Sequence, residues 1–556
     1  MNHSKLTPWK RFIRLLQLER KDILQIFYYA IFSGIVALSL PLGIQAIINL
    51  IQGAQLSTSW VVLVILVTIG VLFSGALQLM QLRIIETLQQ RIFIRASFEL
   101  SYRFPKIKMN ELRNYYPPEL ANRFFDTLTI QKGISKILID IPSALLQIVF
   151  ALILLSFYHP FFILFGVLLL LLIYIVFKFT AQKGLQTSLE ESKNKYKVAH
   201  WIQEIARTVV SFKLSGKTNF ALDKNDSLAA EYLEARESHF RILILQFMQM
   251  IGFKVMVTAG LLLIGGALVL NQEMNIGQFV ASEIIILLVI ASVEKLILGL
   301  ESFYDVLTSI EKLGQVVDKD LERQDGETPD FTKGLTIELD NVFYNVDNRE
   351  KPILQNINFS IHPNSRILIK GESGSGKSSL LSLIAGVIQP TSGNVYINNI
   401  SLKSLFINNY RSQLGLSLSE ETPFEGTIRE NITFGDTTIN DKSIFWALEK
   451  VGLISFIKEQ PNGLQTILYP EGKQVSQTVA KKIMLARAIV KQPKVLILED
   501  PLDQFNQQET NSIIDFLSHP DNPWALLVVS SNSKWQDSSN EIITLDKGII
   551  KHTSKL

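Results

Sequence analysis

The chain has 556 residues and a mean hydropathy of +0.24, a length too great for one hydrophobic core and a hydropathy that soluble enzymes seldom reach. Its net charge of +3 is small and its basic residues are spread through loops, which argues against a nucleic-acid partner. The absence of cysteine excludes disulfides, thiolate metal sites and a cysteine nucleophile.

The N-terminal half holds six apolar segments, each long enough to cross a bilayer as a helix. They cover residues 23–50, 60–85, 137–158, 160–179, 242–270 and 279–300. The connections within the first, second and third pairs of segments carry no Lys or Arg, whereas the other connections are rich in both. The positive-inside rule therefore predicts a multi-pass protein of the cytoplasmic (inner) membrane, surrounded by lipid, with both termini in the cytosol.

The segment TPWKRFIRLLQL precedes the first span and has apolar residues at helical spacing among cations. This pattern predicts an uncleaved helix at the membrane interface, and an ordinary amphipathic cytosolic helix is the alternative.

The two long cytosolic loops continue the helical patterns of the flanking spans, which predicts helices that extend beyond the membrane. Residues 115–126 and 199–216 in these loops are expected to couple the membrane domain to a second domain. Solvated helical hairpins are the alternative.

Four ionisable residues fall within the predicted spans: Lys254, Glu283, Glu294 and Lys295. Charged groups at membrane depth normally face a cavity or a partner, so Glu283 is a candidate for substrate contact. Lys254 and Lys295 would instead be solvated if their helices continue into the cytosol.

The C-terminal half contains a phosphate-binding loop, GESGSGKS, between the apolar strand 366–370 and an apolar helix. Its glycines let backbone amides wrap phosphates, Lys377 reaches the β and γ phosphates, and Ser378 can coordinate Mg²⁺. A chance glycine-rich turn is the alternative. The residues predicted to contact ATP here are Gly371, Glu372, Ser373, Gly374, Ser375, Gly376, Lys377, Ser378 and Ser379.

The phosphate loop is followed by GVIQPTSGNVYINN, FEGTIRENITFG, IMLARAIVKQPKVLILEDP and IITLDKGII. In order and spacing these segments resemble the cassette domain of ABC exporters, and with the six spans the resemblance covers nearly the whole chain. It is greatest to the type I secretion and bacteriocin exporters, without the peptidase-like domain that some of them carry. The resemblance implies an all-α six-helix transmembrane domain (1–320), a linker (321–334) and an α/β P-loop NTPase, the ABC cassette (335–556).

Several positions depart from the family pattern. Ser419 stands where the family has a glutamine that senses Mg²⁺, and Asn506 replaces an aspartate. The signature segment, LSGGQ in the family, is VSQTV here. Ser476 is retained, but Gln477 and Thr478 occupy both glycine positions, where side chains would obstruct close backbone approach to the γ-phosphate.

The catalytic acids are exchanged relative to the family. Glu499 falls at the position of the Mg²⁺ ligand and Asp500 at that of the general base, where a shorter side chain can cost ~100-fold in rate by misplacement alone. Ser531 stands where the switch histidine is expected. Spacing places Val346 at the adenine-stacking position, although an altered loop would let Tyr344 stack instead.

We therefore expect ATP–Mg²⁺ binding with slow or absent hydrolysis. By the resemblance, the chain works as a homodimer or as a heterodimer with another half-transporter, because each ATP lies between one subunit's phosphate loop and the other's signature segment.

The leading hypothesis is an exporter with a weakened catalytic site, with a periplasmic adaptor protein as a further partner. The alternatives are a non-hydrolytic regulatory or assembly subunit of an export complex, and a channel or receptor with bound nucleotide. Peptides, proteins, lipids and amphipathic drugs all remain possible substrates.

Overall fold

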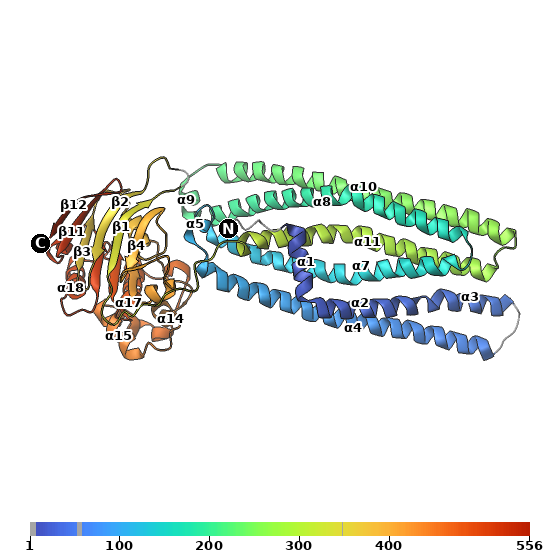
Figure 1. Ribbon diagram of the computed structural model, residues 1–556, viewed down its shortest axis with the longest axis horizontal. Coiled ribbons are helices and arrows are strands. Elements are labelled where there is room, and N and C mark those ends of the chain that lie inside the picture. Colours follow the sequence, from blue (N-terminus) through green and yellow to red (C-terminus); the bar gives the residue numbers. More distant parts are fainter. Residues whose placement is uncertain (1–6, 53–57, 347–348, 556) are drawn as a thin grey trace. The chain divides into compact units, whose positions relative to one another are not determined.

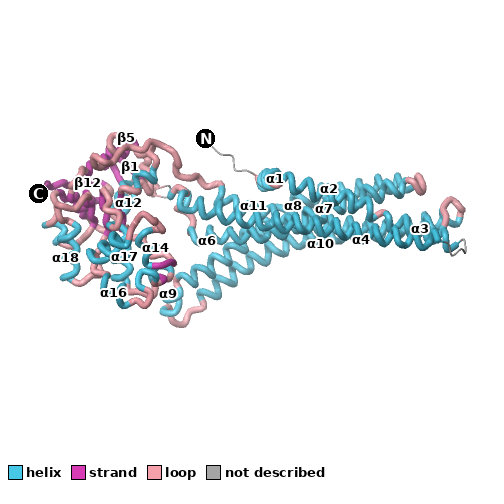
Figure 2. Tube along the Cα trace, turned by 90° about the horizontal axis from the view of Figure 1, so that it is seen from below, coloured by secondary structure: helices cyan, strands magenta, loops and turns pink. Residues whose placement is uncertain are grey.

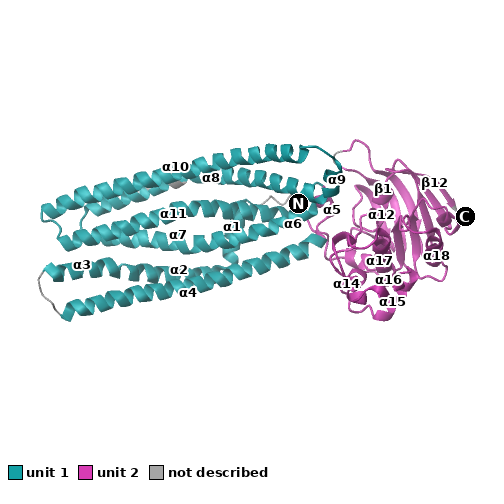
Figure 3. Ribbon diagram, turned by 180° about the vertical axis from the view of Figure 1, so that it is seen from behind, with its two compact units in different colours: residues 1–105, 114–319 teal, residues 106–113, 320–556 magenta. Residues whose placement is uncertain are grey.

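The computed structural model describes residues 7–52, 58–346 and 349–555. The chain forms two compact units, coloured separately in Figure 3. Unit 1 comprises Met1–Pro105 and Asn114–Lys319, and unit 2 comprises Lys106–Arg113 and Asp320–Leu556. Within the described residues, strands occur in unit 2 alone (Figure 2).

The secondary structure in the described part of unit 1 is helical, and its long helices run side by side (Figure 1). Its α-helices are α1 (Pro8–Leu18), α2 (Arg20–Ala37), α3 (Ser39–Gln52), α4 (Thr58–Arg103), α6 (Pro117–Ala121), α7 (Asp126–Ser156), α8 (Phe161–Arg207), α9 (Val209–Leu214), α10 (Phe220–Leu270) and α11 (Ile276–Val317). Six helical stretches among the described residues are long and apolar enough to cross a membrane. This confirms the six predicted spans; the connection at 53–57 lies outside the described residues.

The long helices continue well beyond the apolar segments, as predicted. Helices α4, α8, α10 and α11 contain 46, 47, 51 and 42 residues. At about 1.5 Å per residue they are roughly twice as long as the ~30 Å hydrocarbon core of a bilayer. The coupling role predicted for 115–126, which contains α6, and for 199–216, which contains α9, stays a prediction.

Side-chain packing joins α1 to the helical bundle. Thr7 caps the helix by accepting a hydrogen bond from the Lys10 amide, and Pro8 occupies the first turn. Phe12 is 4% exposed and its ring lies 5.4 Å from that of Phe303 on α11, in an edge-to-face arrangement. Trp9 remains half-exposed. The amphipathic pattern therefore forms the expected helix, with one aromatic residue buried against the bundle.

The described residues of unit 2 form three sheets. An antiparallel sheet has the order β2 (Leu354–Ile361), β1 (Ile337–Tyr344), β4 (Ser392–Ile397), β5 (Ile400–Ser401), and a small one pairs β7 (Gly426–Thr427) with β8 (Ile467–Leu468). The main sheet has the order β12 (Ile549–Lys555), β11 (Glu541–Asp546), β3 (Arg366–Lys370), β10 (Ala525–Val529), β9 (Val495–Glu499), β6 (Leu414–Ser417). All its neighbouring strands are parallel except the β11–β12 pair.

The central strands β3, β9 and β10 each contain at least three consecutive apolar residues and are almost fully buried, as expected for parallel strands covered on both faces. The α-helices of this unit are α5 (Met109–Leu112), α12 (Lys377–Ile384), α13 (Ile407–Arg411), α14 (Ile428–Thr433), α15 (Asp441–Lys450), α16 (Ile454–Glu459), α17 (Gln477–Ile489), α18 (Gln507–Leu517) and α19 (Lys534–Asp537). The chain therefore combines an all-α transmembrane domain with an α/β cassette, as predicted.

The segment Lys106–Arg113 belongs to unit 2 although it lies between two helices of unit 1 in the sequence. Ile107 forms a β-bridge with Leu321, and the Lys108 amide donates to the Asp320 carbonyl at 3.0 Å. The start of the predicted linker is thus held by backbone hydrogen bonds within this unit.

Candidate nucleotide-binding site

The phosphate loop and three further predicted positions, Ser419, Glu499 and Ser531, lie at the carboxyl edge of the main sheet. Strand β3 leads into the phosphate loop at Gly371, β9 ends at Glu499, and β10 ends two residues before Ser531. Strand β6 ends two residues before Ser419. Because these four strands are parallel and adjacent, their carboxyl ends meet, and ligands of α/β sheets bind at such edges.

The phosphate loop has a backbone that requires glycine at two positions. A Cβ atom at Gly371 would lie 2.2 Å from the Leu545 carbonyl oxygen, a contact that no side chain can make. Gly376 has φ +103°, in the left-handed region, and a Cβ there would lie 3.0 Å from the Ile353 carbonyl oxygen. The carbonyl groups of Leu545 and Ile353 therefore leave room for the loop backbone alone at these positions.

Helix α12 begins at Lys377, so its free amides and positive dipole end are directed at the loop. The Lys377 ammonium donates hydrogen bonds to the carbonyl oxygens of Gly371 and Glu372, each at 2.8 Å. Ser375 is 4% exposed, and its hydroxyl has no hydrogen-bond partner among the described residues. Glu372 and Ser373 are exposed on the loop, and Ser379 is half-buried in the first turn of α12.

Ser378, Ser419 and Glu499 are brought together from three separate parts of the sequence. The Ser378 hydroxyl donates a hydrogen bond to Glu499, and the Ser419 amide and hydroxyl both donate to Glu499 Oε2, at 3.1 and 2.9 Å. Hard oxygen donors of this kind suit Mg²⁺, which normally takes one or two protein oxygens, substrate phosphates and water. Among the described residues there is no cluster of three or more His, Cys, Asp or Glu that would hold a metal by itself.

Asp500 lies beside this group in a strained backbone conformation, with φ +40°. Its amide donates to the Val529 carbonyl at 2.9 Å, and the Lys481 ammonium donates to its carbonyl at 3.1 Å. Burial, reinforced by Asp503 and Glu499, raises the pKa of the Asp500 carboxyl above its usual value. Sequence reasoning missed Lys481, because no local motif marks a lysine on α17 as a partner of the segment after β9.

Two further positions of the family pattern, the retained Ser476 and the altered Asn506, cap helices. Ser476 caps α17 by accepting a hydrogen bond from the Val479 amide at 3.2 Å, and Gln477 and Thr478 form the first turn. Asn506 caps α18 by accepting from the Glu509 amide at 2.8 Å. Ser531 is exposed just beyond β10. Within the described part of the chain, no hydrogen bond joins Ser476 to the phosphate loop.

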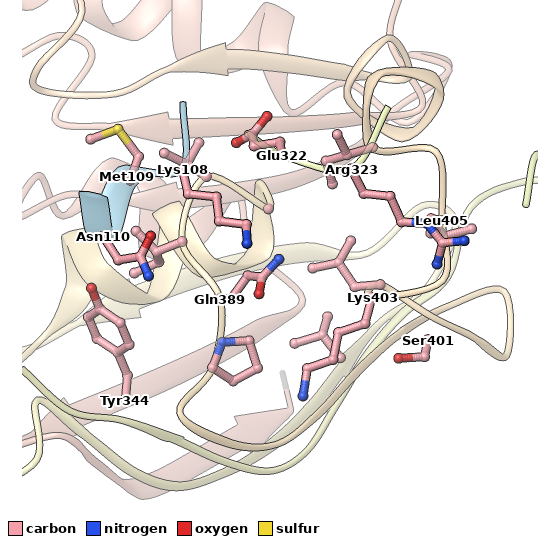
Figure 4. Close-up of a pocket in the computed structure, with 17 residues that line it drawn as sticks. Lys108, Met109, Asn110, Glu322, Arg323, Tyr344, Gln389, Ser401, Lys403 and Leu405 are labelled. Carbon is pink, nitrogen blue, oxygen red and sulfur yellow. The ribbon is translucent and has the colours of Figure 1, made fainter. Parts of the chain in front are cut away.

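Tyr344 is directed into a different pocket, shown in Figure 4. This pocket of about 160 Å³ is also lined by Met109, Asn110 and Gln389, and none of its described lining residues belongs to the phosphate loop. The Arg113 guanidinium lies 5.8 Å from the centre of the Tyr344 ring. Adenine stacking by Tyr344 stays a prediction, and it requires the ring to turn out of this pocket.

Comparison with known proteins identifies two family regions. Residues 23–293 match the ABC transporter transmembrane region, and residues 354–503 match the ABC transporter domain family. The chain is 30% identical over 307 residues to the alpha-hemolysin translocation ATP-binding protein HlyB of Escherichia coli O157:H7, which covers 55% of this chain and 43% of HlyB. It is 29% identical over 344 residues to the leukotoxin translocation ATP-binding protein LktB of Mannheimia haemolytica, covering 60% of this chain and 47% of LktB.

A further relative is the ABC multidrug transporter MDR2 of Trichophyton rubrum, 33% identical over 202 residues, which is 35% of this chain and 15% of that protein. These matches span less than half the length of each relative.

The fold is similar to the structure of a bacterial Atm1-family ABC exporter with ATP bound, with a TM-score of 0.82 and 16% identity over 96% of this chain and 95% of that one. The chain therefore belongs to the ABC transporter family, with a membrane region of exporter fold followed by an ATP-binding cassette on the same polypeptide.

Proposed function

We propose that this protein exports a substrate across the cytoplasmic membrane in an ATP-dependent manner, as one subunit of a dimer whose catalytic sites are weakened. The observation that carries the proposal is the contrast between an intact phosphate loop and an altered set of catalytic positions around it.

ATP binding is supported by the geometry of the phosphate loop. Gly371 and Gly376 occupy positions that exclude a side chain, and α12 directs its N-terminus at the loop. When ATP and Mg²⁺ bind, the Lys377 ammonium would leave its loop carbonyls for the phosphates, and Ser378 and Glu499 would hold the metal, Glu499 through water. The bound metal would neutralise charge on the phosphates.

Weakened hydrolysis is supported by three positions. Asp500 replaces a longer acid at the general-base position, and Gln477 and Thr478 add side chains where the signature segment would approach the γ-phosphate. Misplacement of a catalytic group by about 1 Å can cost ~100-fold in rate. The raised pKa of Asp500 makes it a better proton acceptor than an exposed aspartate, which favours slow turnover over none.

Dimer formation is supported by Ser476, which has no hydrogen bond to the phosphate loop within the described part of its own chain. In the family, a second subunit supplies the signature segment to each nucleotide. Either a homodimer or a heterodimer with another half-transporter would complete the sites.

The distribution of Lys and Arg favours cytosolic termini, which puts the cassette where ATP is available. The likeness to translocation ATP-binding proteins also makes a periplasmic adaptor a partner to test.

The full chain, purified and reconstituted into nanodiscs, tests the proposal. We expect labelled ATP to bind and vanadate-sensitive ATP hydrolysis to be slow but measurable, with both lost in Lys377→Ala. Lys370→Ala is the matched control, because Lys370 lies just before the loop and its ammonium instead donates to Gln536 at 2.6 Å. Failure of the wild-type protein to bind ATP would overturn the proposal. ATP binding with no turnover would replace it by a non-hydrolytic regulatory or assembly subunit of an export complex.

A further inference from the structure

A polar cavity of about 250 Å³ lies among the membrane-spanning helices, separate from the nucleotide site. It is formed by α2, α4, α7 and α11, whose arrangement can be followed in Figure 1. Its polar lining residues are Ser33, Ser74, Gln78, Gln81, Ser143, Gln147 and Lys295. Hydroxyl and amide groups in such numbers are unusual between helices that are otherwise built of Leu, Ile, Val and Phe.

Lys295 is the one charged residue among the described residues that line the cavity. No carboxylate in the described part of the chain lies within ion-pair distance of its ammonium. Lys254 makes a useful contrast, because its ammonium lies 2.5 Å from the Glu294 carboxylate and is therefore neutralised. An uncompensated charge within a membrane span is costly, so such groups normally face a ligand, a partner or water.

The polar neighbours of Lys295 are arranged to offer further donors. Ser33 and Ser74 share a hydrogen bond at 2.9 Å. The side-chain oxygen of Gln147 accepts a hydrogen bond from Ser292 at 2.9 Å, which leaves its NH₂ group to donate. Gln78 on α4 lines the cavity and is exposed. An anion in the cavity would meet an ammonium and amide donors, whereas a cation would meet like charge.

Small residues on α2 make room for a ligand. Ala30 and Ala37 each lie three or four residues from the adjacent pair Ser33 and Gly34, so the four share one face of the helix, and all of them line the cavity. The volume is below the roughly 300–1,000 Å³ of sites that enclose drug-sized molecules. The cavity therefore has the size of a head group, with the rest of a larger molecule left outside it.

We propose that this cavity binds the single oxyanionic head group, a carboxylate or a phosphate ester, of an amphipathic molecule, with Lys295 as its counter-ion. The proposal rests on the export function proposed above and specifies the chemical class of the substrate. The head group could come from an exported solute or from a membrane lipid, and the two sources share the same recognition chemistry.

Direct binding of two fluorescent probes tests the proposal. Dansyl-undecanoate carries a carboxylate, and its methyl ester has the same chain without the charge. Each would be titrated into the full chain in phosphatidylcholine nanodiscs. We expect the wild-type protein to bind the carboxylate at least about tenfold more tightly than the ester, a difference that Lys295→Met abolishes and Lys295→Arg largely keeps.

Lys178→Met is the matched control, because Lys178 is also near the end of a span but lies 5.5 Å from the Tyr174 ring and outside the cavity. The proposal is wrong if the wild-type protein prefers neither probe, if it binds neither, or if Lys295→Met binds the carboxylate as the wild type does. Replacing part of the phosphatidylcholine by phosphatidylglycerol distinguishes the sources: competition identifies a lipid head group, and unchanged binding identifies a solute.

ATP binding by each variant shows that it is folded and separates this proposal from the proposed function. A wild-type protein that binds no ATP but selects the carboxylate through Lys295 would contradict the export proposal alone. A protein that hydrolyses ATP but shows no charge selectivity would contradict this inference alone.

Discussion

The Ser419 amide and hydroxyl both donate hydrogen bonds to one oxygen of Glu499, at 3.1 and 2.9 Å. The family resemblance puts a glutamine at the position of Ser419, so this short link between the two strand ends is made here by a serine. Ser378 donates to the same carboxylate, so Glu499 is held by two serines where a metal-bound nucleotide would sit. These hydrogen bonds would rearrange when Mg²⁺ binds.

The Mg²⁺ dependence of ATP binding should depend on Glu499. In the wild-type protein we expect Mg²⁺ to strengthen ATP binding, and in Glu499→Gln we expect this gain to fall by about tenfold because the neutral amide interacts weakly with the hydrated cation. Fluorescent-nucleotide titrations with Mg²⁺ and with EDTA measure both values. Asp503→Asn is the control, since Asp503 pairs with Lys481 and not with the two serines. Equal Mg²⁺ dependence in wild type and Glu499→Gln would remove Glu499 from the metal site.

Reversing the exchange of acids should increase ATP hydrolysis. We expect Glu499→Asp combined with Asp500→Glu, together with Gln477→Gly and Thr478→Gly, to raise kcat by about 10–100-fold, because the base regains its length and the signature segment regains its backbone approach. Glycines in the first turn of α17 will cost some stability, on the order of 1 kcal/mol each. Steady-state phosphate release gives the rate, and adding Lys377→Ala to the same variant should abolish it. An unchanged kcat would show that other positions limit turnover.

Asp500→Asn should stabilise the protein at neutral pH. The folded-state pKa of Asp500 is raised by burial, so the folded protein binds its proton more tightly than the unfolded chain does. The contribution of this group to stability is therefore present at acidic pH and is lost as the pH rises through the folded-state pKa. We expect a higher thermal midpoint for Asp500→Asn at pH 7, with the difference from wild type shrinking toward pH 4.

Differential scanning fluorimetry in detergent across this pH range measures the midpoints. Asp503→Asn should show no such gain, because its carboxylate is half-exposed and paired with Lys481. A destabilised Asp500→Asn at pH 7 would mean that hydrogen bonds to the carboxylate outweigh its desolvation.

The packing of α7 against α11 should be sensitive to Gly133. A Cβ atom there would lie 2.2 Å from a methyl group of Val306, which is fully buried, so we expect Gly133→Ala to destabilise the protein by about 1–3 kcal/mol. Val306→Ala should also destabilise it, by opening a cavity. Because the second change removes the clashing methyl group, the double variant should lose less stability than the two single variants together.

Thermal unfolding in detergent gives these differences, and Gly252→Ala is the control. A Cβ atom at Gly252 on α10 would meet no atom within 4 Å, so its midpoint should stay at or above that of the wild type. Additive losses in the double variant would contradict the contact between Gly133 and Val306.

The membrane spans and the phosphate loop were predictable because each is encoded locally. Six runs of apolar residues of bilayer length specify six helices whatever their partners are, and the structure confirms them. The phosphate loop is a short segment between a strand and a helix, so its glycines and Lys377 fall in their expected places. Glu499 and Ser531 were identified through the family pattern, and the parallel pairing of β9 with β10 brings the ends of their strands to one edge of the sheet.

Contacts between distant segments could not be predicted in this way. Lys254 and Lys295 look alike in the sequence, each a lysine in an apolar helix, yet of the two only Lys254 forms an ion pair within the described part of the chain. Which lysine is paired depends on the rotation of α10 and α11 about their axes, and that rotation is fixed by packing along the whole length of both helices. The same is true of Tyr344, whose ring occupies the pocket of Met109 and Asn110, more than two hundred residues away in the chain. Local patterns determine which elements form, whereas the side chains that meet between elements are decided by how those elements pack.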